Sequence, residues 1–103
     1  MNARMRDYHF MSTYHVYILS NENRTLYTGV TSNLTLRLEQ HRLGIGSKFA
    51  SKHHTDKLVF AEEAPTMMEA VEREKQIKRW RRSKKIFLIE SINPKWNDLI
   101  YTN

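Results

Sequence analysis

The stretch at residues 27–44, YTGVTSNLTLRLEQHRLG, decides how the rest of this chain is interpreted. Its first residues are β-branched or aromatic and predict the end of a strand. Ser32 and Asn33 are residue types preferred at helix N-caps, so a helix is expected to follow at once. Gly44 is a residue type common just past a helix end. The stretch therefore predicts a strand joined directly to a helix, with Gly29 as the point where the chain begins to turn.

This strand–helix unit carries three polar side chains that suit phosphate chemistry. Tyr27 lies in the strand, and Arg37 and His41 lie four residues apart in the helix. That spacing places the guanidinium and the imidazole on one helix face, about 6 Å apart along the axis. Such a set is unusual for a hydrophobic core but suits the binding and cleavage of a phosphodiester. For His41, the alternative is an ordinary surface histidine.

The remaining elements follow from hydrophobic periodicity and turn residues. The pattern predicts strands at 14–20, 26–31 and 57–62, helices at 34–43, 66–81 and 84–92, and a loop at 44–55. Thr66 and Glu69 form a capping box for the second of these helices, and Ser83 is the expected cap of the third. The order β-β-α-β-α-α predicts an α+β fold, with a small three-stranded antiparallel sheet flanked by helices.

Several apolar residues are expected to bury against this sheet. In the first helix Leu34 and Leu38 share one row, and Leu36 and Leu43 share a second. The other candidates are Ile86, Phe87 and Ile89 in the last helix and Trp96, Leu99, Ile100 and Tyr101 in the tail.

Length and composition limit the possible classes of protein. The chain has 103 residues, which predicts one domain at 13–103 and a loosely ordered extension at 1–12, with Met11 as an alternative translation start. The net charge of +6 favours a polyanionic partner, nucleic acid before an anionic membrane surface. The absence of cysteine excludes disulfides, thiolate catalysis and cysteine zinc sites.

No targeting or membrane segment is visible in the sequence. No apolar run approaches the roughly 20 residues of a membrane span. The first ten residues lack the apolar core of a signal peptide. We therefore expect a cytoplasmic protein that does not enter a membrane, and we assume a monomer.

The segment at 44–55 combines glycines and small residues with side chains that can carry positive charge. These are Lys48, Lys52, His53 and His54. The composition fits a phosphate-binding loop and a plain solvated connection equally well.

Glu74 is the main candidate for a metal-binding carboxylate. On a helical wheel it falls within the apolar arc made by Met67, Ala70, Val71 and Ile77. A carboxylate on an inner helix face is costly unless a cation meets it. Arg37 and a divalent metal are the two candidates for that cation. The alternative is a buried Glu–Arg pair that only orients two helices.

Cations crowd the chain around and beyond Glu74. They are Lys75, Lys78, Arg79, Arg81, Arg82, Lys84 and Lys85. Seven like charges within eleven residues repel one another, so a bound polyanion explains them better than a solvated face does. Trp80 lies among them, either as a core residue or as a stacking platform for a base or sugar.

Two short motifs and the residues that follow them resemble the GIY-YIG nuclease superfamily. The first signature corresponds to His15-Val16-Tyr17 and the second to Tyr27-Thr28-Gly29. Arg37, His41 and Glu74 follow in order and spacing. The resemblance spans about residues 14–101. It is greatest to small standalone endonuclease-like proteins that are similar to the N-terminal nuclease domain of the bacterial excinuclease.

The resemblance implies hydrolysis of phosphodiester bonds with one divalent metal, Mg²⁺ or Mn²⁺. Glu74 would bind the metal, and Arg37 would hold the scissile phosphate and stabilise its developing charge. Tyr17 or Tyr27 would act as general base or orient the attacking water, and His41 would assist proton transfer or hold a phosphate. Gly29 would let the substrate approach closely. Together with the cations named above, Gly29 thus completes the predicted nucleic-acid surface.

Two departures from the family pattern bear on turnover. His15 replaces the glycine of the first signature, and Val30 stands where excinuclease-type members have a lysine. Lys48 is a candidate to replace that lysine. The leading expectation is a DNA endonuclease in repair or recombination. The alternatives are a nucleic-acid-binding module without catalysis and a basic adaptor for an acidic protein.

Overall fold

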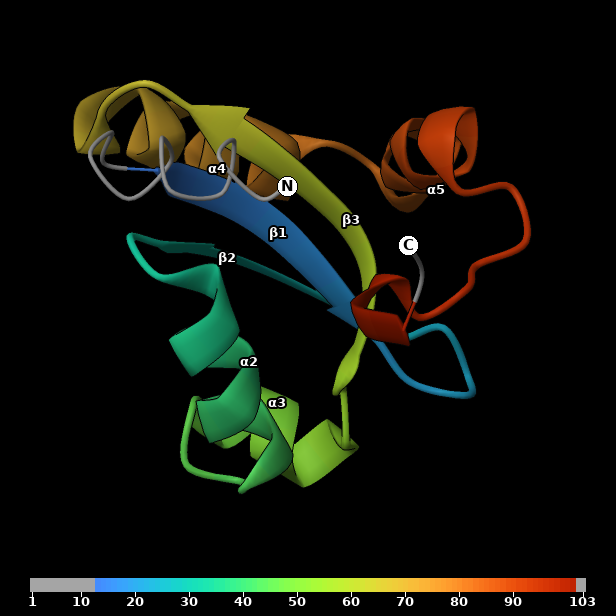
Figure 1. Ribbon diagram of the computed structural model, residues 1–103. Helices are drawn as coiled ribbons and strands as arrows, with labels where there is room; N and C mark the ends of the chain where they lie inside the picture. Colours follow the sequence, from blue (N-terminus) through green and yellow to red (C-terminus); the bar gives the residue numbers. More distant parts are fainter. Residues whose placement is uncertain (1–12, 102–103) are drawn as a thin grey trace.

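The computed structural model describes residues 13–101, and the extension at 1–12 lies outside the described residues. The elements are β1 Tyr14–Ser20, β2 Leu26–Thr31, α2 Leu34–Arg42, α3 Lys48–His53, β3 Lys57–Ala64, α4 Met67–Arg79, α5 Arg82–Ile92 and the 3₁₀ turn η1 Leu99–Tyr101 (Figure 1). The three strands form one antiparallel sheet flanked by helices, which confirms the predicted α+β class.

The central strand β1 organises the sheet. The strand order is β2-β1-β3, and Tyr17 of β1 pairs with Gly29 of β2 on one side and with Ala61 of β3 on the other. Every residue from 16 to 20 is fully buried. Because side chains alternate along a strand, β1 must be covered on both faces.

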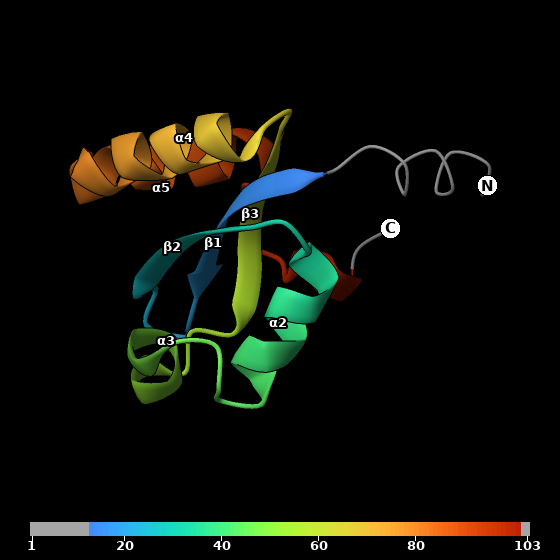
Figure 2. The same ribbon diagram turned by 90° about the vertical axis from the view of Figure 1, so that its left-hand side faces the viewer.

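Helices α4 and α5 cover one face of the sheet, whereas α2 and α3 lie on the other side (Figure 2). The first face packs Val16 and Ile18 against Ala70 and Ile77 of α4 and Ile89 of α5. The start of α4 is fixed by the predicted capping box, in which the backbone N–H of Glu69 donates to the Thr66 hydroxyl at 3.1 Å.

The second face buries a smaller cluster. Tyr17, Leu19 and Leu58 form its centre, and Leu34, Leu38, Leu99 and Ile100 pack against it. Helix α2 is capped at its N-terminus by Asn33, whose side-chain oxygen accepts from the Leu36 N–H at 3.1 Å. The helix ends before Gly44, which adopts a positive φ of 79°. This positions α2 with its leucine row on the sheet.

The structure contradicts several of the expected apolar positions. Leu36, Leu43 and Phe87 are 53%, 68% and 74% exposed. In α2 the Leu34–Leu38 row alone reaches the sheet, so the second leucine row faces solvent. In α5 the buried position is Ile89, with Ile86 only partly covered.

One whole element and several element boundaries also differ from expectation, including β3, which ends at Ala64 rather than at residue 62. Residues 48–53 form α3 instead of belonging to a continuous loop. That segment contains neither glycine nor proline, and its Phe49 packs against Tyr27. Helix α5 begins at Arg82, with Arg81 rather than Ser83 at the N-cap and no side-chain capping bond. The preceding helix α4 ends at Arg79, two residues earlier than predicted.

None of the helices within residues 13–101 is both long and apolar enough to cross a membrane.

The C-terminal tail is tied to the sheet by one buried side chain, Asn93. Its amide nitrogen donates to the carbonyl oxygens of Val59 at 3.1 Å and Asn97 at 2.9 Å. Its side-chain oxygen accepts from the Asn97 N–H at 3.0 Å. The next turn buries Trp96, so the tail docks as predicted.

Replacing this anchor is expected to destabilise the fold. Asn93→Ala leaves two carbonyls and one N–H without their partner, at a cost of about 1–3 kcal/mol in the free energy of unfolding. Urea denaturation followed by circular dichroism measures this. The control is Asn23→Ala at an exposed position, which should change stability by less than about 0.5 kcal/mol. Equal stability of the two variants would contradict the role given to Asn93.

Candidate active site

Three of the predicted catalytic side chains meet on the α2 side of the sheet. Tyr17 comes from β1, Tyr27 from β2 and His41 from α2. The ring centroids lie 6.3 Å apart for Tyr17 and Tyr27, 5.9 Å for Tyr17 and His41, and 5.3 Å for Tyr27 and His41. The Tyr17 hydroxyl and His41 Nε2 share a buried hydrogen bond of 3.1 Å. The predicted combination of residues is therefore a real spatial cluster.

Gly29 makes room for Tyr17. A Cβ built on Gly29 would lie 2.5 Å from both Cζ and the hydroxyl oxygen of Tyr17, well inside contact distance. Gly29 is buried within β2, which continues to Thr31. The predicted turn at Gly29 is therefore wrong, because its missing side chain accommodates the phenol of the neighbouring strand. Closeness to a substrate at Gly29 stays a prediction.

Burial controls the ionisation of Tyr17. The side chain is fully buried, and this burial, with the nearby Tyr27 second, raises the pKa of Tyr17 to about 12. Arg37 opposes the rise through its charge and a hydrogen bond. The Tyr17 phenol therefore keeps its proton at neutral pH and is a poor general base.

His41 is held as a neutral ring. It is only 5% exposed, which excludes the alternative of a surface histidine. Burial lowers the pKa of His41, and the positive charge of Arg37 lowers it further. Gly46 packs directly on the ring, because a Cβ there would lie 2.8 Å from Nδ1. That Nδ1 is buried and has no hydrogen-bond partner in the structure.

Arg37 retains donor capacity inside the cluster. Its Nη1 donates to Gln40 Oε1 at 3.1 Å. Its Nε is buried and has no hydrogen-bond partner. A buried guanidinium N–H without a partner is costly unless a ligand satisfies it, and an arginine fork matches phosphate oxygens. Arg37 is therefore the residue of this cluster best suited to bind a phosphate.

Glu74 lies apart from the cluster. It belongs to α4, which packs against β1 and β2 from the face opposite α2 (Figure 2). Its side chain is 15% exposed, so the predicted inward position is correct. The cation that meets it is Lys78 of the same helix, at 3.0 Å, rather than Arg37. The predicted partner Arg37 bonds Gln40 instead, because the sheet separates α2 from α4.

The predicted nucleic-acid-binding cations fall into two groups on opposite sides of the sheet. Lys48 and Lys52 are exposed on α3. The second group surrounds α4 and α5 and comprises Lys75, Lys78, Arg79, Arg81, Arg82, Lys84 and Lys85. All of this second group except Lys85 are exposed. A polyanion that contacts both groups must therefore pass the edge of the sheet.

The ring of Trp80 is near two cations, Lys84 of the second group and Arg73 of α4. The Lys84 Nζ is 4.4 Å from the centroid of its ring, and the Arg73 guanidinium carbon is 5.3 Å away. Arg73 is itself fixed by Glu62 at 2.9 Å. The ring is partly buried against the first core. Trp80 thus serves the core and holds cations, which limits its use as a stacking platform.

Phe49 is the residue near the cluster that sequence reasoning missed. Its ring lies 6.0 Å from that of Tyr27, with the two planes 26° apart. His53, one helical turn later, lies 4.4 Å from Phe49. The sequence signal that could have identified Phe49 is an aromatic residue between two lysines, within the segment expected to be a loop.

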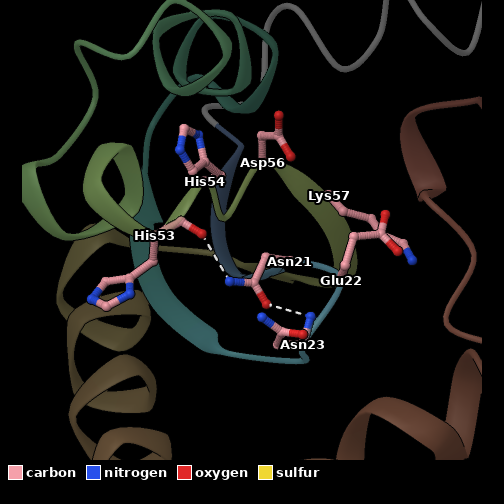
Figure 3. Close-up of a pocket in the computed structure, with 7 residues that line it drawn as sticks. All are labelled: Asn21, Glu22, Asn23, His53, His54, Asp56 and Lys57. Atoms are coloured by element: carbon pink, nitrogen blue, oxygen red, sulfur yellow. Dashed lines mark hydrogen bonds between the residues drawn. The ribbon is translucent and has the colours of Figure 1, made fainter.

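Asn21 anchors the end of α3 beside the sheet. Its amide nitrogen donates to the His53 carbonyl at 2.8 Å, and its side-chain oxygen accepts from the Asn23 N–H at 2.9 Å (Figure 3). These bonds lie in a pocket of about 310 Å³ between the β1–β2 loop and the connection from α3 to β3. The His53 ring points away from the other side chains drawn in Figure 3. The pocket therefore has a structural role in placing α3.

The buried neutral histidine predicts a pH dependence of stability. In the unfolded chain His41 binds a proton near its ordinary pKa of about 6.5, whereas the folded state resists protonation. Below about pH 6.5 the unfolded state therefore binds more protons, and stability falls as the pH falls. His41→Gln should show a shallower loss between about pH 7 and 5. The measurement is urea denaturation at each pH.

Exposed His54 provides the matched control. His54→Gln should follow the wild-type pH profile. The half-buried His15, whose pKa is also lowered mainly by burial, leaves a residual slope in every variant. A His41→Gln profile as steep as that of the wild type would contradict the assignment.

Comparison with known proteins identifies the family of this chain. The family model described as the GIY-YIG catalytic domain matches residues 13–87. A UPF0213 protein from Syntrophus aciditrophicus is 40% identical over 85 residues, which cover 82% of this chain and 97% of that protein. A UPF0213 protein from Staphylococcus haemolyticus is 35% identical over 80 residues, covering 78% and 98% of the two chains.

A solved structure shows the same likeness. The solution NMR structure of a UPF0213 protein from Bacillus halodurans superposes with a TM-score of 0.55 at 27% sequence identity. The match covers 88% of this chain and 99% of that chain. The matched range of residues 13–87 includes both tyrosine signatures, Arg37, His41 and Glu74. The chain therefore belongs to the GIY-YIG catalytic domain family, a nuclease family.

Proposed function

We propose that this protein is a metal-dependent endonuclease that hydrolyses phosphodiester bonds in DNA. The observation that carries the proposal is Arg37, which has a buried donor without a partner beside the Tyr17–Tyr27–His41 cluster. Membership of a nuclease family and the positive charge of the chain support the same conclusion. DNA repair or recombination is the expected setting.

The environments of the two tyrosines support different proposed roles for them. Tyr27 is only half-buried and lies at the open side of the cluster, so it is the proposed general base. Tyr17 keeps its proton and positions His41 through their hydrogen bond. His41 is neutral and adjoins the Tyr27 ring, so it can assist proton transfer. Arg37 binds the phosphate and stabilises its developing negative charge.

Glu74 is the proposed ligand for the metal. Within residues 13–101 no group of three or more histidine, cysteine or acidic side chains is arranged to hold an ion. A lone carboxylate fits Mg²⁺ or Mn²⁺ nonetheless, because Mg²⁺ is commonly held by one or two carboxylates, with water and substrate phosphate as its other ligands. Such an ion, when bound, would neutralise charge on a phosphate of the substrate where the strand passes the β2 edge between α2 and α4. The bond from Lys78 must loosen for Glu74 to act as its ligand.

A second candidate is a nucleic-acid-binding module without turnover. The Glu74–Lys78 ion pair favours it, because a carboxylate already paired has less need of a metal. Val30 at the position of the excinuclease-type lysine favours it too. This candidate predicts salt-sensitive binding, no cleavage with any metal, and unchanged affinity for Glu74→Ala.

Two charge-removing substitutions test the proposed reaction. Glu74→Gln and Arg37→Ala should each lower the rate of nicking of branched or supercoiled DNA with Mg²⁺ or Mn²⁺ by about a hundredfold or more. Glu72→Gln is the matched control, because Glu72 is exposed on the same helix. It should nick like the wild type. Full activity of Glu74→Gln would exclude a metal-ligand role.

The assignment of the base is tested by removing one hydroxyl at a time. Tyr27→Phe should abolish nicking while leaving stability within about 0.5 kcal/mol. Tyr17→Phe should retain measurable nicking but lose about 1 kcal/mol of stability, because it breaks a buried hydrogen bond. Single-turnover rates and urea denaturation separate the two effects. The reverse pattern of activities would make Tyr17 the base.

A further inference from the structure

The surface of α3 carries a feature that the reaction above does not use. We propose that Phe49 and His53, flanked by Lys48 and Lys52, form a subsite that stacks an unpaired base next to the cleaved phosphate. The substrate would then be a nucleic acid with unpaired nucleotides at the cut. This inference rests on the proposed function for its substrate class.

An aromatic row, made of Tyr27, Phe49 and His53, connects this subsite with the cluster. Tyr27 lies 6.0 Å from Phe49, and Phe49 lies 4.4 Å from His53, between ring centroids. Tyr27 in turn lies 5.3 Å from His41. A base placed on the outer part of the row would therefore belong to a nucleotide close to the phosphate bound by Arg37.

Phe49 is the most exposed member of the row. Tyr27 and His53 are half-buried, whereas Phe49 is 43% exposed. A phenylalanine that is exposed to this degree gains little from folding alone. Asn21 bonds the last carbonyl of α3, so the row is anchored to the sheet. The subsite is thus preorganised rather than formed by a free loop.

The charge around Phe49 matches a phosphate backbone. Residues 40–55 contain no aspartate or glutamate. Lys48 and Lys52 are exposed on either side of Phe49 in α3. Both also line a shallow hollow of about 530 Å³ next to the loop at residues 44–47. A segment without acidic residues that exposes two lysines favours a polyanion over a protein partner, although Leu43 and Ile45 are exposed nearby and Glu22 and Asp56 line the pocket beside His53.

Stacking on Phe49 sets a condition on the substrate. In a duplex both faces of each base are covered by neighbouring bases, so a protein ring can reach only a flipped, terminal or single-stranded base. Base–aromatic stacking contributes about 1–3 kcal/mol per base. The subsite therefore discriminates flapped, gapped or branched nucleic acid from a continuous duplex.

Binding without cleavage tests this subsite independently of the reaction. Duplex DNA and the same duplex with a short single-stranded gap, carrying 2-aminopurine in the unpaired segment, are titrated with full-length protein in EDTA. The wild type should bind the gapped DNA more tightly and quench the 2-aminopurine fluorescence. Phe49→Ala should lose the quenching and about fivefold or more of the gapped-DNA affinity, with the duplex affinity unchanged.

Two further variants separate stacking from folding and charge. Phe49→Leu keeps apolar packing against Tyr27 and should lose the quenching like Phe49→Ala, whereas Phe49→Trp should retain it. Lys48→Ala should weaken binding to both DNAs alike and reduce the salt dependence of binding. Circular dichroism checks that each variant is folded, and Phe49→Leu decides the matter if Phe49→Ala does not fold.

The outcomes distinguish this inference from the proposed reaction. Equal affinity of the wild type for both DNAs overturns the subsite, and so does an equal loss of both affinities in Phe49→Leu. A wild-type dimer that becomes monomeric on Phe49→Leu, seen by light scattering, overturns it in favour of a protein interface. Quenching by a wild type that cuts no DNA with any metal supports the subsite and refutes the endonuclease proposal alone.

Discussion

The packing of the Tyr17 phenol over Gly29 is the contact on which the rest of the site depends. The two residues face each other across the β1–β2 pair, and no side chain larger than hydrogen fits at Gly29 without moving the phenol. The phenol then reaches His41 and fixes it by a hydrogen bond. One close approach between two strands thereby sets the position of a helix residue and, with it, the orientation of α2.

The same packing gives the two tyrosines different environments. Complete burial makes Tyr17 an excellent structural group and a poor base, because its pKa rises to about 12. Tyr27 lies two residues before Gly29 on the edge strand β2, where it contacts His41 and Phe49 without being fully buried. Two residues of one type, named together by the family motif, thus have different physical environments.

Sequence reasoning succeeded where local signals were sufficient. Strand alternation identified β1 and β2 at their observed bounds, and the Thr66–Glu69 spacing identified the start of α4. The spacing of Tyr17, Tyr27 and His41 anticipated a cluster that the structure brings together. Sequence reasoning failed where tertiary contacts determine the local structure. Helix α3 depends on packing of Phe49 against Tyr27, and Gly29 serves a ring on another strand, which no local pattern shows.

The surroundings of Glu74 also depend on tertiary packing. The helical wheel correctly predicted that the Glu74 side chain points inward. A helical wheel does not show which layer of the fold that helix face packs against. In the structure α4, which carries Glu74, and α2, which carries Arg37, lie on opposite sides of the sheet (Figure 2). Strand β2 is at the edge of the sheet, contacts α4, and carries Tyr27. A ligand that touches both sides must therefore pass this edge, next to the aromatic row. A flexible unpaired strand can follow such a path more easily than a rigid duplex can, which connects the subsite on α3 with the position of Glu74.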